Sequence, residues 1–210
     1  MYVFDLDGTL IDSTKRHYLL MARLLKEAEQ RITHDFVQGY MSYKAAGNSG
    51  YQYLERILHI PSDLACTIQQ KWIDEIESKY WLNYDKLYAD AIPILDFLKE
   101  HNKRIIFLTM RKNEAFLHEE LRMLGINIYP DEVIVLTPCG QIHKGDVLKK
   151  SNEVIDFVIG DTETDYDAAV QVRAKSYILH RGFRNRDFWK RRKVISYDSL
   201  AYLKQIIIDG

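Results

Sequence analysis

Three short runs of mainly apolar residues, far apart along the 210-residue chain, constrain the fold more than any other feature of the sequence. They span residues 1–4, 104–108 and 155–159, and each one ends in polar or turn-forming residues. Their hydrophobicity is continuous and not alternating, which is typical of parallel strands that are buried on both faces of a sheet. We therefore expect a parallel sheet that is covered by helices on both sides.

Helical patterns fall between and after these runs. The predicted helices span 93–101, 113–124, 145–150, 165–174 and 199–207, and weaker strand candidates span 133–136, 176–179 and 194–195. The alternation of strands and helices from about residue 90 onward favours right-handed crossovers and a doubly wound α/β sheet. In such sheets ligands bind at the carboxyl ends of the strands, near the point where the strand order reverses. The polar residues that follow the three apolar runs are therefore candidates for a functional site.

The stretch 13–89 interrupts the alternation after a single strand. Its apolar residues have helical spacing, and it contains no convincing strand. We expect residues 13–89 to form a helical cap domain, inserted into an α/β core made of residues 1–12 and 90–210. The insertion holds eight of the 14 tyrosines, together with Trp72 and Trp81. We interpret these rings mainly as the core of a small lobe, although some of them could line a substrate pocket.

The composition is that of an ordinary globular chain, with 47% hydrophobic and 28% charged residues. The 29 basic and 30 acidic residues leave a formal charge of −1, which provides no general attraction for nucleic acid or for anionic membranes. No apolar run approaches the roughly 20 residues that would cross a bilayer, and no signal peptide is visible. Cys66 and Cys139 fit no metal-binding or redox spacing, so both are expected to be free thiols. We expect a cytoplasmic monomer or homodimer.

The residues Asp5-Leu6-Asp7-Gly8-Thr9 directly follow the first predicted strand. Strand periodicity would place the carboxylates of Asp5 and Asp7 on the same side of the chain. Two carboxylates at that separation repel each other unless a cation lies between them or one of them is protonated. Gly8 allows a sharp turn at this point. An acidic turn without a function is the alternative, but the five-residue pattern is specific enough to favour a site.

A second acidic group, Gly160-Asp161-Thr162-Glu163-Thr164-Asp165, follows the run 155–159. If Asp165 begins the next helix, its carboxylate and that of Asp161 can converge on one point. Carboxylates from separate strands suit Mg²⁺, which prefers oxygen ligands. An acidic loop that merely caps a helix is the alternative. Together the two groups favour a Mg²⁺ site.

Two further candidates are residues that could hold an anion near these carboxylates. Thr109 ends the run 104–108, and its hydroxyl and the backbone N–H groups of the following turn can bind a phosphoryl oxygen. Lys144 precedes a predicted helix and could supply a compact positive charge. Lys149 and Lys150 remain competitors for the role of Lys144.

In this order the four motifs, DxDGT, Thr109, Lys144 and GDxxxD, resemble those of the haloacid dehalogenase superfamily, over nearly the whole chain. The pattern is similar to its phosphoglycolate phosphatase and β-phosphoglucomutase branch, which carries a small helical cap. Gly145 follows Lys144, whereas many members of that branch have proline there. This difference leaves the expected fold and chemistry in place but weakens the transfer of any particular substrate.

The resemblance implies a Mg²⁺-dependent phosphatase that acts on a small phosphorylated metabolite. Asp5 would be the nucleophile that forms an aspartyl-phosphate, and Asp7 would be the general acid and base. Mg²⁺ would be bound by the Asp5 and Asp161 carboxylates and the Asp7 backbone carbonyl, with Asp165 as a ligand or a supporting neighbour. Thr109 and Lys144 would bind the phosphoryl oxygens.

Three alternatives remain open. A phosphomutase would use the same residues, and the presence of Asp7 argues against a dehalogenase. The phosphonatase branch uses a cap lysine, for which Lys15, Lys26 and Lys44 are available. A protein of another class could bind nucleic acid, without catalysis, through the basic and aromatic stretch 181–193, although we favour a solvated loop there. In the cap, Lys44 and Arg56 are candidate contacts to the far end of a substrate.

Overall fold

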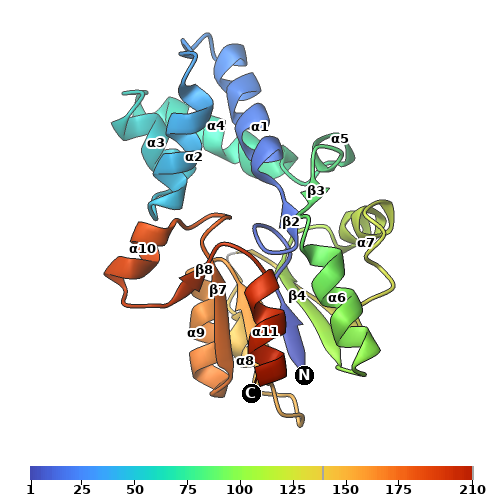
Figure 1. Cartoon of the computed structure of the whole chain (residues 1–210). Coiled ribbons are helices and arrows are strands. Elements are labelled where there is room, and N and C mark those ends of the chain that lie inside the picture. The colour runs from blue at the N-terminus through green and yellow to red at the C-terminus, as the bar shows by residue number, and fades with distance from the viewer. Residues whose placement is uncertain (139, 210) are drawn as a thin grey trace.

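The computed structural model describes residues 1–138 and 140–209, and its core confirms the predicted doubly wound α/β fold (Figure 1). The central sheet has the strand order β5-β4-β1-β6-β7-β8, and every neighbouring pair is parallel. Its strands are β1 (Tyr2–Phe4), β4 (Ile105–Met110), β5 (Glu132–Leu136), β6 (Phe157–Gly160), β7 (Lys175–Leu179) and β8 (Ser196–Tyr197). Because β1 lies between β4 and β6, the strand order reverses at β1, and a ligand site is expected at its carboxyl end.

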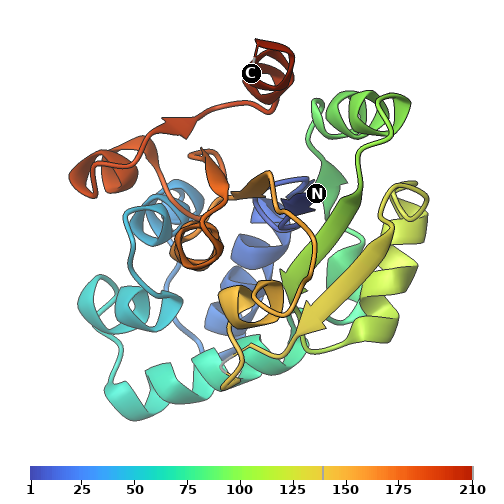
Figure 2. The same ribbon diagram turned by 90° about the horizontal axis from the view of Figure 1, so that it is seen from below.

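Helices cover both faces of this sheet, as the figures show from two directions (Figures 1 and 2). The core helices are α6 (Ala91–Glu100), α7 (Glu114–Met123), α8 (Lys144–Leu148), α9 (Glu163–Val172), α10 (Arg186–Arg191) and α11 (Ala201–Asp209). Tyr2 and Phe4 of β1 join one hydrophobic cluster with α6, α7 and α11. Val3 points the other way and joins a second cluster with α8 and α9. This alternation explains why the strands read as continuously apolar.

The helices between β1 and α6 form a separate body above the sheet in Figure 1. They are α1 (Thr14–Glu27), α2 (Phe36–Ala45), α3 (Gly50–Arg56), α4 (Ser62–Glu75) and α5 (Lys79–Leu82), which we call the helical unit. The unit has its own hydrophobic cluster, in which Tyr40, Tyr53 and Trp81 are buried. This cluster agrees with the interpretation that most rings of the insertion build a small lobe. It supports the predicted division into a cap and a core, which remains a prediction.

Two short strands join the helical unit to the core. They are β2 (Ile11–Asp12) and β3 (Lys86–Leu87), which pair antiparallel with each other. Neither strand was predicted, because two residues are too few to show an alternating pattern. The helical unit is therefore attached through a narrow pair of strands beside the carboxyl end of β1.

The basic stretch 181–193 is not the solvated loop that we predicted. Residues 186–191 form α10, and the Phe188 and Trp189 side chains are buried against β7. The last strand also lies two residues later than expected, at 196–197 instead of 194–195. Two buried aromatic residues outweigh the local abundance of charge, which is why the loop prediction was wrong.

Two predictions about the chain as a whole concern cysteines and membranes. Cys66 is an exposed free thiol, as expected, whereas Cys139 lies outside the described residues. Within residues 1–138 and 140–209 no helix has the length and apolar character needed to cross a membrane.

Candidate active site

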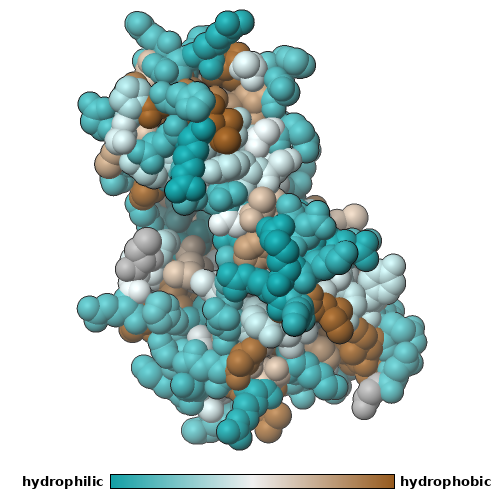
Figure 3. All heavy atoms as spheres, turned by 90° about the vertical axis from the view of Figure 1, so that its left-hand side faces the viewer, coloured by the Kyte–Doolittle hydropathy of each residue, from teal (hydrophilic) through white to brown (hydrophobic). Residues whose placement is uncertain are grey.

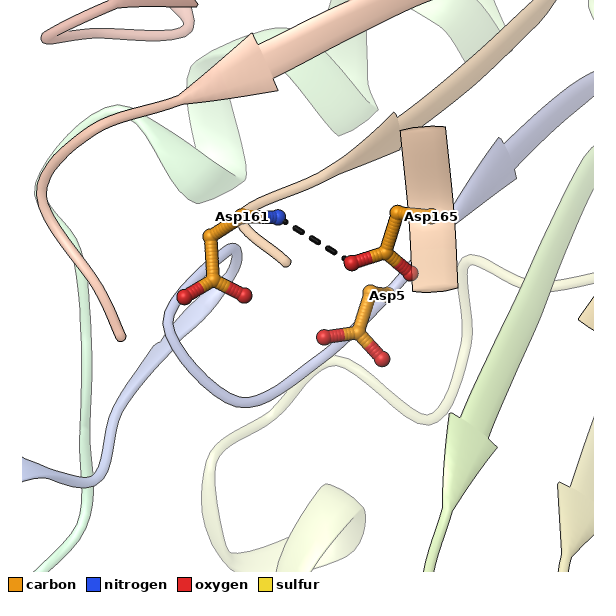
Figure 4. Close-up of side chains that lie close together, drawn as sticks. All are labelled: Asp5, Asp161 and Asp165. Carbon is orange, nitrogen blue, oxygen red and sulfur yellow. Dashed lines mark hydrogen bonds between the residues drawn. The ribbon is translucent and has the colours of Figure 1, made fainter. Parts of the chain in front are cut away.

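Three carboxylates from distant parts of the chain meet at the carboxyl edge of the sheet (Figure 4). Asp5 follows β1, Asp161 follows β6, and Asp165 lies in the first turn of α9. One oxygen from each lies within 4.8 Å of the others, and all three residues are buried. Because β1 and β6 are hydrogen-bonded neighbours, their ends bring Asp5 and Asp161 together without any long loop.

The turn after β1 is held close to this cluster by Gly8. Its φ angle is +78°, in the left-handed region that glycine adopts without strain. A Cβ atom at this position would overlap with the carboxylate of Asp161. Gly8 is therefore required both for the turn and for the space that the second carboxylate occupies.

Lys144 is the lysine that the fold places among these carboxylates. Its Nζ donates to Asp5 Oδ1 at 2.5 Å and to Asp165 Oδ1 at 2.7 Å, and its side chain is buried. Lys149 and Lys150 are exposed. The two ion pairs outweigh the cost of burial and raise the pKa of Lys144, so it remains a cation in the site.

Asp165 has a structural role in addition to its pair with Lys144. Its Oδ2 accepts hydrogen bonds from the backbone N–H groups of Asp161 and Thr162 at 3.2 and 3.0 Å, and from the Thr162 hydroxyl at 2.8 Å. Thr162 and Asp165 form a capping box at the start of α9. Both oxygens of Asp165 are thus engaged, and the residue fixes the strand end and the helix that carry its neighbours.

The negative charge of the cluster is only partly compensated by Lys144. Burial raises the pKa of Asp5 to about 7, with Lys144 opposing and Asp165 adding to the rise. Burial, with the charges of Asp5 and Asp165, raises the pKa of Asp161 well above its ordinary value. Such shifts show that the site disfavours three carboxylates without a further cation.

The donor set fits a hard divalent cation. Asp161 Oδ2 accepts from the backbone N–H of Phe183 at 2.5 Å, but Asp161 Oδ1 is buried and has no hydrogen-bond partner within the described residues. An unpartnered buried carboxylate oxygen is costly. Because an oxygen of Asp161 lies within 4.8 Å of an oxygen of Asp5, the two residues supply oxygen ligands of the kind that Mg²⁺ prefers.

Asp7 is held between two arginines that the sequence analysis did not identify. Arg111, two residues after Thr109, donates to Asp7 through Nε at 2.7 Å and through Nη2 at 3.1 Å. Arg16 of α1 donates to Asp7 Oδ1 at 2.5 Å. Burial opposes ionisation of Asp7, but the two guanidinium groups outweigh it and lower its pKa. Asp7 is therefore a carboxylate in this structure.

The same arginines continue into a buried charged cluster. Arg111 pairs with Glu120 of α7 at 3.1 Å, and Arg16 pairs with Asp85 at 3.2 Å. The Asp85 and Glu120 side chains are fully buried. Burial, opposed by Arg16 and reinforced by neighbouring acids, raises the pKa of Asp85 to about 9. No local motif marks these residues, because they come together only through the contact between α1, α7 and the segment before β3.

A cavity of about 720 Å³ opens from the carboxylates toward the helical unit. Asp5, Asp7, Thr109 and Lys144 all line it, and Thr109 is buried at the end of β4. A hollow is visible at the level where the helical unit meets the core (Figure 3). This volume is typical of a small-molecule site.

The two cap residues predicted to contact a substrate lie elsewhere. Arg56 is exposed at the end of α3 and does not line the cavity. Lys44 lies behind the cavity wall, where its Nζ is 2.9 Å from Nδ1 of His17. Its ammonium group lies about 5 Å from the ring centres of Trp72 (5.1 Å) and Phe183 (5.2 Å). Of this group, His17, Trp72 and Phe183 line the cavity, and Lys44 does not.

Comparison with known proteins is consistent with this geometry. The family model of haloacid dehalogenase-like hydrolases matches residues 1–173. No curated protein sequence matches the chain.

The solved structures include several with the same fold. A predicted phosphatase from Clostridium acetobutylicum is 20% identical, with a TM-score of 0.73 over 100% of this chain and 98% of that one. A predicted phosphoglycolate phosphatase from Haemophilus somnus 129PT is 17% identical, with a TM-score of 0.71 over 99% and 97%. Protein Tyrosine Kinase A (PtkA) from Mycobacterium tuberculosis is 19% identical, with a TM-score of 0.72 over 98% and 96%. At these identities the likeness establishes the fold, and the family-model match over most of the chain shows that this protein belongs to the haloacid dehalogenase-like hydrolases.

Proposed function

We propose that the protein is a Mg²⁺-dependent phosphatase that hydrolyses a small phosphomonoester through an aspartyl-phosphate on Asp5. The observation that carries the proposal is the arrangement around Asp5, whose carboxylate lies within 4.8 Å of ligand atoms of Asp161 and Asp165 and 2.5 Å from Lys144. Asp5 and Lys144 line the same cavity, and Asp161 lies beside Asp5, where the two carboxylates would bind the cation. Residues 13–89 would form the cap over this site.

In the first step, a carboxylate oxygen of Asp5 would attack phosphorus, and the bond between phosphorus and the ester oxygen would break. Lys144 and Thr109 would hold the other phosphoryl oxygens and offset their charge. Asp7, once protonated, would give its proton to the departing alcohol oxygen. The products of this step are the free alcohol and the phosphorylated Asp5.

In the second step, Asp7 would accept a proton from water while the water oxygen attacks phosphorus, which releases phosphate and restores Asp5. The Arg16 and Arg111 pairs favour the ionised form of Asp7 that this step requires. Asp5, Asp161 and the Asp7 backbone carbonyl would hold Mg²⁺, and Asp165 lies close enough to contribute. When bound, Mg²⁺ lowers the repulsion between a carboxylate nucleophile and an anionic phosphoryl group.

A panel of phosphorylated metabolites assayed for phosphate release, with Mg²⁺ and with EDTA, tests this proposal. We expect turnover of at least one compound with Mg²⁺, its loss in EDTA, and a loss of at least roughly 10³-fold in Asp5→Asn. Asp167→Asn is the matched control, because Asp167 is exposed on the same helix as Asp165. Comparable rates in the wild type and in Asp5→Asn would remove Asp5 as the nucleophile. Transfer of phosphate to a second sugar phosphate without release would indicate a mutase.

A further inference from the structure

One wall of the cavity is mainly apolar and aromatic. Trp72 and Ile73 come from α4, Ile76 follows that helix, and Phe183 comes from the segment after β7. His17 of α1 lies between two of these rings, 5.1 Å from the ring centre of Trp72 and 4.6 Å from that of Phe183. Three separate elements thus contribute one continuous aromatic surface.

Two cationic side chains of the lining, Arg184 and Lys112, already have acidic or carbonyl partners. Arg184 pairs with Glu163 at 2.7 Å. Lys112 donates through Nζ to the carbonyl of Ile73 at 3.0 Å. A second anionic group on a ligand would compete with Glu163 for Arg184, whose side chain is only 19% exposed, and separating that pair is costly.

Arg16 and Arg111 are engaged in the same way. They pair with Asp7 and with the buried carboxyl groups of Asp85 and Glu120. Glu77, which also lines the cavity, adds a negative charge and accepts from backbone N–H groups of the β4–α7 turn. The described lining therefore favours an uncharged group over an anionic one.

His17 adds a neutral hydrogen-bond donor to this wall. Lys44 Nζ lies 2.9 Å from Nδ1; when the charged lysine donates there, Nδ1 offers its lone pair and the ring proton is on Nε2. Burial, with the charges of Lys44 and Arg16, also lowers the pKa of His17 well below its ordinary value. Nε2 makes no hydrogen bond to any residue of the described ranges. It can therefore donate to a hydroxyl, a carbonyl or a ring nitrogen of a ligand.

We infer that the site accepts a phosphomonoester of an uncharged alcohol that carries a flat ring, with the ring against the wall of His17, Trp72 and Phe183. This inference rests on the proposed phosphatase function for the position of the phosphoryl group beside Asp5. It excludes as preferred substrates the esters whose alcohol carries a carboxylate or a second phosphate. The ring provides the contact area, and the phosphoryl group provides the charge.

Binding of a matched pair of non-hydrolysable ligands tests the inference without requiring turnover. The pair is benzylphosphonate and 4-carboxybenzylphosphonate, measured by calorimetry on the full chain in the presence of Mg²⁺. We expect benzylphosphonate to bind at least about tenfold more tightly. Ethylphosphonate, which has no ring, should also bind at least about tenfold more weakly than benzylphosphonate. Equal or tighter binding of the carboxylated ligand, or equal binding of ethylphosphonate, would overturn the inference.

A variant pair assigns the preference to the wall. Trp72→Leu should reduce the ratio of the affinity for benzylphosphonate to that for ethylphosphonate by about fivefold or more. Tyr80→Leu should leave this ratio unchanged, because Tyr80 is 61% exposed and does not line the cavity. An unchanged affinity ratio in Trp72→Leu would contradict the assignment.

Hydrolysis of benzyl phosphate and 4-carboxybenzyl phosphate then separates the two proposals. If binding follows the expected order but neither these esters nor the metabolite panel is hydrolysed, the phosphatase proposal fails and the ligand class stands.

Discussion

Asp161 lies where its charge is only partly compensated, with one oxygen held by the Phe183 N–H and the other buried without a described partner. A cation bound there should stabilise the fold, and removal of the carboxylate should remove that effect. We expect Asp161→Asn to lower the affinity for Mn²⁺, used as a Mg²⁺ substitute, by at least about tenfold in calorimetry. Mg²⁺ should raise the Tm of the wild type and of Asp167→Asn but not that of Asp161→Asn. Unchanged Mn²⁺ binding by Asp161→Asn would contradict the proposed ligand set.

Lys44 gives a pH-dependent contribution to stability. Burial, together with Arg184 and Arg16, lowers its pKa to about 7, whereas the unfolded chain has a lysine pKa of about 10.4. Between these values the unfolded chain binds more protons than the folded chain, so the contribution of Lys44 to stability rises with pH. Relative to Lys44→Met, the wild-type free energy of unfolding should increase by roughly 3–4 kcal/mol from pH 7 to pH 10. Urea unfolding at the two pH values measures this, and a constant difference would show that Lys44 keeps an ordinary pKa.

A sequence motif reveals functional residues only when residues that are close together in the chain also lie close together in the site. Asp5, Asp7, Asp161 and Asp165 belong to two short motifs at strand ends, and the structure brings three of them together and Asp7 beside Arg111. Arg16, Asp85 and Glu120 could not be predicted, because no local pattern distinguishes a buried ion pair from a surface charge.

At the scale of elements, the segment after β7 docks the helical unit onto the core. The carbonyl of Ala45, the last residue of α2, accepts a hydrogen bond from the backbone N–H of Asn185 at 2.8 Å. The carbonyl of Lys44 accepts one from Arg184 Nη1 at 3.4 Å. Cationic and N–H donors suit the negative end of a helix. The basic stretch that suggested nucleic-acid binding thus provides at least part of its charge to a contact within the chain.

Phe188 of α10 supports this docking contact. Its ring occupies the space where a Cβ atom of Gly47 would lie, just after α2. We expect Phe188→Ala to lower the free energy of unfolding by about 3 kcal/mol and to speed amide exchange at Asn185. Tyr202→Ala is the control, because this ring on α11 is 56% exposed. It should change neither the free energy of unfolding nor the exchange rate at Asn185. Exchange at Asn185 that remains as slow as in the wild type would show that the contact does not depend on Phe188.

Element boundaries show where sequence reasoning reaches its limit. The long apolar run at 104–108 predicted β4, which spans Ile105–Met110, because a continuous run in this context is typical of a central strand. The residues of α10 were misread, since their burial depends on contacts with β7 that the local sequence does not contain. β3 is set by its pairing with β2 and has no pattern of its own.

For the whole molecule, Arg16 links the helical unit to the core. From α1 it reaches Asp7 in the core, Asp85 before β3, and the carbonyl of Ile76 at 3.2 Å. Its replacement leaves the Asp7 carboxylate with one guanidinium partner instead of two and removes the partner of the buried Asp85 carboxyl group. We expect Arg16→Met to lower the free energy of unfolding by about 3–5 kcal/mol.

The matched control for Arg16→Met is Arg23→Met on the same helix. The Arg23 side chain is 39% exposed and pairs with Glu27 and Glu75 at the surface, so its loss should cost less than about 1 kcal/mol. Urea unfolding compares the two variants. Equal losses of stability would show that the buried cluster contributes no more than a surface pair.

The proposed chemistry requires Asp5 to accept a phosphoryl group, and acid quenching during turnover followed by mass spectrometry tests this most directly. With a hydrolysed substrate and Mg²⁺, the peptide that contains Asp5 should carry the mass of one phosphoryl group, and the label should be absent from Asp5→Asn and from reactions in EDTA. Phosphate release at the wild-type rate with the label on another residue, or its persistence in Asp5→Asn, would contradict the account.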